Sequence, residues 1–332
     1  MRKAKKILKI EIIKAHKITK MLLGALLIPC VFFAQDTIYF DSANPFSFKD
    51  IITDLDNQKC QNVYGVLRMP YNFQLDKKYP LIVAVAGSNG WSSHHYQYLQ
   101  MYRENGIATF ELCSFQSRGI ESTVGNQIDV TTAMMILDSY RAVEALRNHP
   151  NIKYNKIGIT GWSLGGGVSL FSAWNPLKKA INNSISFAAH LPIYPPCIVT
   201  PNVLDFGDSP IHILIGELDN WTPSEACSEL VNKLKNKSNI DITIYPDAHH
   251  SFDRDSPLLV KENGYILEDC RFLMKADGTV YMDFLNFPMT TPILQKIGLF
   301  TCAKRGPTYG GNKMAKTQAL IFAEEFMNMH LH

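Results

Sequence analysis

Three residues that can act as a nucleophile, a base and an orienting acid follow one another along the chain. Ser163 lies in the stretch GITGWSLGGGVSL, Asp219 in GELDNWTP and His250 in PDAHHSFD. A serine hydroxyl is a weak nucleophile at neutral pH, so it needs a neighbouring base that takes its proton and an acid that orients the base. These residue types in this order predict acyl transfer through a covalent intermediate on the serine.

The glycines beside Ser163 predict how its hydroxyl is exposed. Gly161 and Gly165 lie two residues before and after the serine, and Gly166 follows. Residues without a side chain allow a tight turn and a close approach between a strand and the helix that follows it. We therefore expect the serine on a sharp strand-to-helix turn.

Two backbone amides are needed to bind the oxyanion that forms during acyl transfer. Leu164 supplies one of them by its position after the nucleophile. The turn GSNG (87–90) follows an apolar run and supplies the other from Ser88 or Asn89. This chemistry requires no metal and no cofactor, so we expect neither.

Each of the three residues also has a plainer interpretation. A serine at this place suits the N-cap of a helix as well as catalysis. Asp219 also suits a helix cap, and Glu217 is close enough in the sequence to take its place. His249 is adjacent to His250, and spacing alone does not separate two neighbours on a turn.

Short β-rich runs precede the candidate residues and the GSNG turn. Most of these runs are continuously apolar, as in strands that are buried on both faces. They are 62–69, 81–86, 107–113, 156–160, 184–189, 211–216 and 241–245. Ligands of a parallel sheet bind beyond the carboxyl ends of its strands, which is where these residues fall.

Helical patterns lie between the strands, at 129–148, 224–235 and 315–331. The alternation predicts an α/β fold with a mostly parallel central sheet and helices on both faces. The pattern breaks at about 253–314, where RFLMKADGTVYMDF indicates a hairpin that turns at Asp277-Gly278. We expect this segment to be an insertion before the C-terminal helix, lying over the sheet edge or the site.

The N-terminus is typical of an export signal, so we expect a signal peptide over 1–34 and one domain over 35–332. Eight Lys and Arg residues and one Glu lie in residues 1–35. The apolar run MLLGALLIPCVFFA has 14 residues, fewer than the roughly 20 that span a bilayer. Cleavage after Ala34 predicts a periplasmic or secreted protein with no stable membrane span. The alternatives are an uncleaved membrane anchor or a lipoprotein attached at Cys30.

Charge in the rest of the chain does not favour nucleic acid as a partner. After residue 35 the chain has 25 basic and 29 acidic residues. The net positive charge of +3 therefore comes from the N-terminus. Basic residues with interleaved aromatics, which are typical of nucleic-acid binding, form no stretch there. We expect a small acyl compound as the binding partner, and the sequence indicates no oligomeric state.

The motifs together resemble a dienelactone hydrolase-type α/β-hydrolase, and most closely its exported relatives with a serine nucleophile. The resemblance covers about residues 60–331. It runs through the stretches AGSNGW, SFQSRGIEST, GWSLGGG, GELDNWTP, YPDAHHSF and AKRGPTYGGNKMAKTQALIFAEEF.

The resemblance implies Ser163, Asp219 and His250 as a catalytic triad. It favours His250 over His249 because the histidine of the family lies two residues before a phenylalanine, here Phe252. The chain departs from the founding members at one position, since they carry cysteine where Ser163 stands. The fold follows from the resemblance, whereas a dienelactone substrate does not.

Further residues are candidates for contact with substrate. Dienelactone hydrolases hold a substrate carboxylate with two arginines from comparable loops, because guanidinium binds carboxylate in a forked pair. The resemblance therefore implies Arg118 and Arg254 as substrate contacts here. The plainer interpretation is that Arg118 braces its loop and Arg254 pairs with a nearby aspartate in solvent. Trp91, Trp162 and Trp221 lie beside site elements and are candidates for an aromatic acyl pocket, although large aromatic side chains are also commonly just buried.

Six cysteines remain after Cys30, an even number that permits disulfides in an exported chain. The relatives keep cysteines near four of these places, which implies the pairs Cys270–Cys302 and Cys197–Cys227. Cys60 and Cys113 are then free. The alternative is a set of buried thiols.

These observations predict an exported serine hydrolase that cleaves an ester, a lactone or a related acyl compound. Alternatives are a peptidase or acyl-peptide hydrolase on the same fold, or an inactive binding protein. The peptidase needs an anchor for a peptide terminus, which the sequence does not contain.

Overall fold

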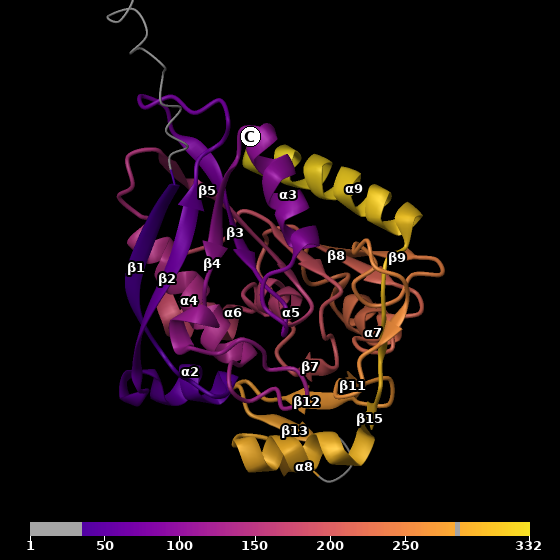
Figure 1. The fold of residues 1–332 in the computed structure, drawn as a ribbon. Helices are drawn as coiled ribbons and strands as arrows, with labels where there is room; N and C mark the ends of the chain where they lie inside the picture. The colour runs from indigo at the N-terminus through magenta and orange to yellow at the C-terminus, as the bar shows by residue number, and fades with distance from the viewer. Residues whose placement is uncertain (1–34, 283–285) are drawn as a thin grey trace, which may run out of the picture. The chain divides into compact units, whose positions relative to one another are not determined.

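A computed structural model describes residues 35–282 and 286–332, and the predicted signal peptide over 1–34 lies outside them. The central sheet has eight strands in the order β1-β2-β4-β3-β5-β6-β8-β9 (Figure 1). They are β1 Gln35–Ala43, β2 Cys60–Arg68, β3 Tyr79–Val85, β4 Ala108–Leu112, β5 Ile152–Trp162, β6 His190–Ile193, β8 Ile211–Gly216 and β9 Ile240–Tyr245. β1 and β2 are antiparallel to their neighbours and the other six strands run parallel. The predicted mostly parallel sheet is confirmed.

The main helices pack in two groups. They are α2 Phe48–Asp54, α3 Ser93–Glu104, α4 Thr132–Ala145, α5 Leu164–Phe171, α6 Asn175–Asn182, α7 Ser224–Leu234 and α9 Lys313–Leu331. Short 3₁₀ turns cover Leu55–Asn57 and Gln116–Arg118. α3 and α9 contact each other as well as β4 and β5, whereas α4 contacts α5 and α6.

Two glycines of β5 show that these groups cover opposite faces of the sheet. A Cβ on Gly158 would meet Met327 and Leu331 of α9, and one on Gly161 would meet the backbone of Gly165 in α5. Residues an odd number apart in a strand point to opposite faces. The sheet is therefore covered on both sides, as predicted.

Two features of the sheet differ from the sequence prediction. The predicted strand 184–189 is wrong, because β6 begins at His190. Ile185, Phe187 and Ala189 are buried, so alternating burial in the connection before the strand resembles a strand pattern. β1 was not predicted, because it is an edge strand with mostly exposed residues and lacks the apolar run that marks the inner strands.

The segment 253–314 forms small sheets and one helix on the side of the central sheet where β7 lies (Figure 1). Its elements are β10 Leu259–Val260, β11 Tyr265–Ile266, β12 Phe272–Met274, β13 Val280–Met282, β14 Phe287–Pro288, α8 Pro292–Cys302, β15 Lys304–Arg305 and β16 Thr308–Tyr309. β12 and β13 pair antiparallel, so the predicted hairpin is confirmed. β12 also pairs in parallel with β7 Val199–Pro201, which joins the insertion to the rest of the domain.

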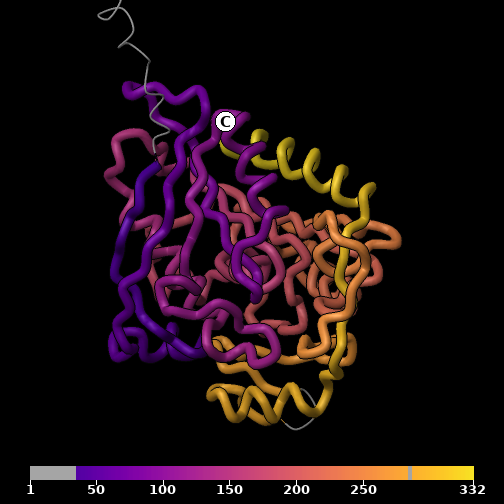
Figure 2. Tube along the Cα trace, viewed as in Figure 1, coloured from indigo at the N-terminus to yellow at the C-terminus, as the bar shows by residue number. Residues whose placement is uncertain are grey.

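Gly278 explains how the hairpin turns and where its tip lies. Its φ is 79°, a conformation that favours glycine. Asp277 stabilises the turn by accepting a hydrogen bond from the amide of Thr279 at 3.0 Å. A Cβ on Gly278 would collide with the backbone of Phe48 and Lys49, so the tip packs directly against α2. Figure 2 follows this orange segment along the trace.

Both predicted disulfides are confirmed. Cys197 and Cys227 have Cα atoms 4.8 Å apart, and Cys270 and Cys302 have theirs 5.1 Å apart, within the range that a disulfide bridges. Cys60 and Cys113 are free. Burial raises the pKa of the Cys113 thiol to about 12, which makes it a poor nucleophile.

Within residues 35–282 and 286–332, none of the helices combines the length and the apolar character that a membrane span requires.

Candidate active site

Ser163 lies between the end of β5 and the start of α5, on a strained turn. Its φ is 55° and its ψ is −114°, a combination that residues with a side chain rarely adopt. The turn holds the serine between two rigid elements while leaving it partly exposed, whereas its neighbours Trp162 and Leu164 are buried. The predicted strand-to-helix turn is present.

The glycines around the serine are required by close packing of backbone on backbone. A Cβ on Gly161 would collide with the carbonyl group of Gly165, and a Cβ on Gly165 would collide with the carbonyl oxygen of Val85. A Cβ on Gly166 would press against the carbonyl oxygen of Ile193. No larger residue fits these positions, so the first turn of α5 lies directly against the sheet.

His250 joins Ser163 to Asp219. Its Nε2 lies 3.0 Å from Ser163 Oγ, and its Nδ1 lies 2.7 Å from Asp219 Oδ2. His250 and Asp219 are 2% and 3% exposed. An Nδ1 proton donated to the carboxylate leaves Nε2 as the acceptor that faces the serine hydroxyl. The structure thus brings the three predicted residues together in the order nucleophile, base and acid.

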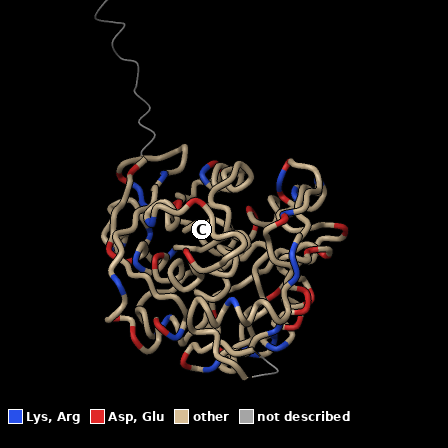
Figure 3. The backbone as a smooth tube through the Cα atoms, turned by 60° about the horizontal axis from the view of Figure 1, so that its bottom comes forward, with Lys and Arg blue, Asp and Glu red and all other residues tan. Residues whose placement is uncertain are grey.

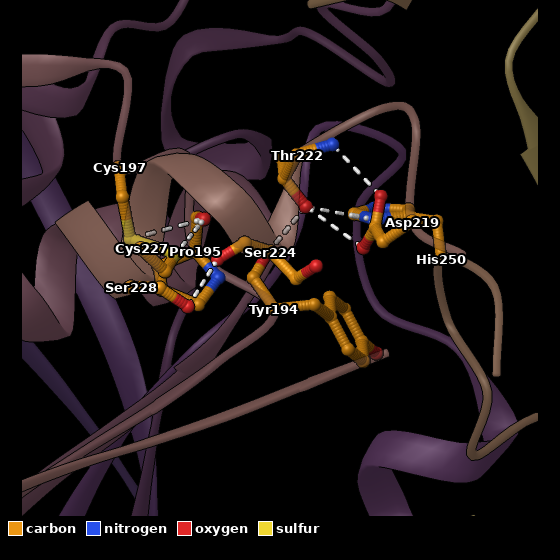
Figure 4. Close-up of a disulfide and its surroundings, with 9 residues drawn as sticks. All are labelled: Tyr194, Pro195, Cys197, Asp219, Thr222, Ser224, Cys227, Ser228 and His250. Atoms are coloured by element: carbon orange, nitrogen blue, oxygen red, sulfur yellow. Dashed lines mark hydrogen bonds and ion pairs between the residues drawn. A yellow bond between two sulfur atoms is a disulfide. The ribbon is translucent and has the colours of Figure 1, made fainter. Parts of the chain in front are cut away.

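The Asp219 carboxylate is fixed by hydrogen bonds from residues just before α7, of which Figure 4 shows Thr222. Its Oδ1 accepts hydrogen bonds from the amides of Trp221 at 3.0 Å and Thr222 at 2.8 Å. Its Oδ2 accepts from Thr222 Oγ1 at 2.9 Å in addition to His250. Donors on both oxygens set the orientation of the carboxylate toward the histidine. Asp219 therefore also caps a turn, so the capping and triad interpretations are compatible.

The two alternatives that the sequence left open lie outside this arrangement. His249 Nδ1 is 2.9 Å from Thr308 Oγ1 rather than near the serine. Glu217 is exposed, and its Oε2 accepts a hydrogen bond from the amide of Asp247 at 3.1 Å.

The predicted oxyanion loop faces Ser163. Gly87 and Gly90 close the turn through a hydrogen bond of 2.9 Å from the Gly90 amide to the Gly87 carbonyl. Ser88 borders both cavities that contain Ser163, whereas Asn89 borders one of them and is exposed. Leu164 begins α5, so its amide is one of the helix N-terminal donors left without an intrahelical acceptor. The loop and the helix start are thus placed on either side of the serine.

Two cavities meet at Ser163. The first has a volume of about 210 Å³ and lies between the oxyanion loop, the start of α5 and the insertion. The second is smaller, about 70 Å³, and is bordered by His250, Arg254 and Lys261.

His95 borders the second cavity and stacks on Trp162 with ring centroids 4.4 Å apart. Its Nδ1 accepts a hydrogen bond from the amide of Ser92 at 3.2 Å, which leaves Nε2 as the protonated nitrogen. Burial, assisted by His94, holds the pKa of His95 well below its usual range. His95 is therefore a neutral N–H donor beside the site. The sequence feature that marks His95 is its position three residues after Ser92, where its side chain caps the start of α3.

The tryptophans support the site from different positions. Trp162 is fully buried and borders the second cavity. Trp91 packs edge-on against Trp162 at 6.2 Å and donates to the Leu112 carbonyl, and it borders neither cavity. Trp221 borders both cavities, with its ring 4.9 Å from that of His250. Trp162 and Trp221 thus border the site, whereas Trp91 does not.

The expected contact of Arg118 with substrate is contradicted by its surroundings. Its guanidinium forms a forked pair with Asp138, at 2.7 and 3.1 Å, and neither side chain is exposed by more than 6%. The same group donates to Asn44 Oδ1 and to the carbonyls of Ala43 and Ser114. All five N–H groups are therefore used inside the fold.

Arg254, in contrast, borders the second cavity. One of its terminal nitrogens lies 3.4 Å from Ser92 Oγ, and its guanidinium lies over the ring of Tyr309 at 5.6 Å. Arg254 can thus place a positive charge beside a group bound at Ser163.

Charged residues of both signs alternate over the described backbone (Figure 3). Within residues 35–282 and 286–332, three or more His, Cys, Asp or Glu side chains are nowhere grouped as metal ligands.

Comparison with known proteins gives a family. The model of the dienelactone hydrolase family matches residues 99–269, a range that contains Ser163, Asp219 and His250. No curated protein sequence matches the chain.

Solved structures are similar to the chain, and the two with TM-scores of 0.50 and above share its fold. The structure of m3DLH is 12% identical, covers 90% of this chain and 100% of its own, and has a TM-score of 0.56. The dienelactone hydrolase-like promiscuous phosphotriesterase P91 from metagenomic libraries is 12% identical with the same coverage and a TM-score of 0.50. The Pyrococcus furiosus esterase Pf2001 is 15% identical over 66% of this chain and 85% of its own, with a TM-score of 0.45.

Proposed function

The chain belongs to the dienelactone hydrolase family, and from that membership we propose that it is a serine hydrolase that cleaves a carboxylic ester or lactone. The observation that carries the proposal is the continuous contact from Ser163 Oγ through His250 to Asp219, at 3.0 and 2.7 Å. A nucleophile, a base and an orienting acid within hydrogen-bond reach are the elements of acyl transfer.

In the acylation step, Ser163 Oγ attacks the substrate carbonyl carbon while its proton passes to His250 Nε2. The developing negative charge on the carbonyl oxygen is stabilised by the amide of Leu164 and the amide of Ser88 or Asn89. Asp219 stabilises the protonated imidazole and keeps its Nδ1 proton in place. The C–O bond to the leaving group then breaks, and the leaving oxygen takes the proton from His250 Nε2.

Deacylation repeats these steps with water. His250 Nε2 takes a proton from water as the water oxygen attacks the acyl carbon. Collapse of the second tetrahedral intermediate breaks the bond to Ser163 Oγ, which regains a proton from His250. The product is a carboxylic acid and the enzyme returns to its starting state.

Arg254 is the residue that we propose for contact with a polar or anionic part of the substrate. Its position in the cavity beside His250 supports this role. An ester that carries a free carboxylate should therefore be hydrolysed faster than a neutral ester of equal size.

We further propose that the protein is exported. The two disulfides favour an oxidising compartment, where such bonds form and persist.

The triad is tested most directly with the adjacent histidines as a matched pair. The wild-type protein should hydrolyse p-nitrophenyl acetate and react with a fluorophosphonate probe. His250→Ala and Ser163→Ala should each lower kcat by about 10⁴-fold or more, while His249→Ala should retain most of the activity. A wild-type protein that does not react with the probe would instead indicate a binding protein. Cleavage of peptides with no turnover of esters would favour the peptidase alternative.

A further inference from the structure

The first cavity is built for an uncharged group. Its volume of about 210 Å³ exceeds the roughly 150 Å³ of an apolar cavity that binds benzene. Among residues 35–282 and 286–332, no Lys, Arg, Asp or Glu side chain borders it. Leu164, Phe171 and Ile198 of the main domain contribute apolar surface close to Ser163. A phenyl ring or a medium-length alkyl chain can therefore be buried there.

The insertion supplies the opposite wall of this cavity. Leu267, Phe272 and Leu299 border it and are 4–9% exposed. The Cys270–Cys302 disulfide joins the two parts of the wall, because Cys270 lies between Leu267 and Phe272 while Cys302 ends the helix that carries Leu299.

The same wall is bonded to the elements of the site. The Leu267 amide donates to the carbonyl of Asn220, next to Asp219, at 3.0 Å. The Phe272 amide donates to the Ile198 carbonyl at 2.8 Å. Gln295 of α8 donates from Nε2 to the carbonyl of Gln127 at 2.9 Å. The wall is therefore fixed relative to the serine and belongs to the binding site.

The position of His250 assigns each cavity to one part of an ester. The leaving-group oxygen must take its proton from His250 Nε2, so the leaving group lies on the side of His250. His250 borders the second cavity and does not border the first. The acyl part of the substrate therefore lies in the first cavity.

We infer that the first cavity is the acyl pocket, and that its disulfide-linked wall in the insertion selects esters of medium-length alkyl or aromatic carboxylic acids. This inference rests on the proposed ester hydrolysis and adds the class of acyl group. Each methylene that moves from water into the cavity should raise kcat/KM roughly fourfold.

The first test compares p-nitrophenyl acetate with p-nitrophenyl hexanoate, and ethyl hexanoate with its isomer hexyl acetate. We expect kcat/KM to rise on the order of 100-fold from acetate to hexanoate. We also expect ethyl hexanoate to be preferred over hexyl acetate. Equal rates for the two p-nitrophenyl esters, or a preference for hexyl acetate, would overturn the inference while leaving ester hydrolysis intact. A protein inactive on all four esters would instead overturn the proposed function.

The second test fills the pocket from the insertion. Leu299→Trp should bring the kcat/KM for hexanoate down to within a few-fold of that for acetate. Phe300→Trp is the matched control, because Phe300 is the next residue of α8 and is 88% exposed. It should change neither rate.

A cooperative thermal unfolding transition reports whether each variant is folded. If Leu299→Trp is not folded, Val280→Phe fills the same cavity from β13 and decides the question. A folded variant that keeps the full preference for hexanoate would overturn the inference. Replacing Cys270 and Cys302 with serine should lower the hexanoate-to-acetate ratio, because the two parts of the wall are then no longer linked.

Discussion

Replacing the strained serine with glycine should stabilise the protein while abolishing its activity. Ser163 has a φ of 55° and a ψ of −114°, close to the first central position of a type II′ turn, where glycine dominates. A residue with a side chain in such a sparsely populated region costs about 1–3 kcal/mol. Glycine removes this cost but loses about 0.5–1 kcal/mol through the greater freedom of the unfolded chain.

The appropriate reference is Ser163→Ala, because both variants lose the hydrogen bond to His250 and only alanine keeps the strain. We expect Ser163→Gly to exceed Ser163→Ala in free energy of unfolding by about 0.5–2 kcal/mol. In a domain of this size the gain corresponds to about 1–4 °C in Tm. Calorimetry and urea unfolding of the two inactive variants measure the difference directly.

Ser172 provides the control on the same helix. It follows α5 with a φ of −63° and a ψ of −18°, so it carries no such strain. Ser172→Gly should be less stable than Ser172→Ala by about 0.5–1 kcal/mol. The reasoning would be refuted if Ser163→Gly were also less stable than Ser163→Ala, because the turn would then carry no strain.

Three further predictions follow from burial and close packing. Burial lowers the pKa of His190 to about 4, so between about pH 6.5 and 4 the unfolded state binds a proton that the folded state does not. The free energy of unfolding should therefore fall by about 1.4 kcal/mol per pH unit over this range. Urea unfolding of His190→Asn should show a shallower decline. Gly165→Ala should prevent accumulation of folded protein, because the new Cβ would collide with backbone atoms. Gly119→Ala is the control: Gly119 has a φ of 67° and nothing within 4 Å of an added Cβ, so the substitution should lower the free energy of unfolding by only about 1 kcal/mol. Arg118→Ala should destabilise the fold by about 3–5 kcal/mol by leaving Asp138 buried and unpaired; if stability is unchanged and only KM rises, the arginine contacts substrate after all.

The central strands and the residues at their ends could be predicted because their local patterns are compatible with few other structures. Continuous apolar runs such as 81–86 and 211–216 are typical of strands that are buried on both faces. The structure has strands at both places. Once these strands are parallel, the residues that follow them meet at one edge of the sheet. The sequence therefore brought Ser163, Asp219 and His250 together without any knowledge of distances.

Residues whose roles depend on distant partners could not be predicted in this way. Arg118 follows a strand end and was expected at the mouth of the site, but its direction is set by Asp138, which is twenty residues away in α4. Asp138 lies within a helical pattern of apolar residues, and no local signal marks it as an ion-pair partner. The wall of the first cavity likewise comes from the insertion, whose short strands lack a periodic pattern.

The insertion leaves and rejoins the domain at one place. The Gly310 amide donates to the His250 carbonyl at 3.0 Å, and the Asn312 amide donates to the Phe252 carbonyl at 2.8 Å. The ends of this long loop are thus pinned together beside the base, so the entropy of closing it depends only weakly on its length. Evolution or protein engineering can therefore exchange the segment between these two anchors for one of another length or composition while the triad stays in register. The insertion wall of the acyl pocket can then be exchanged, so substrate range can diverge faster than chemistry within the same scaffold.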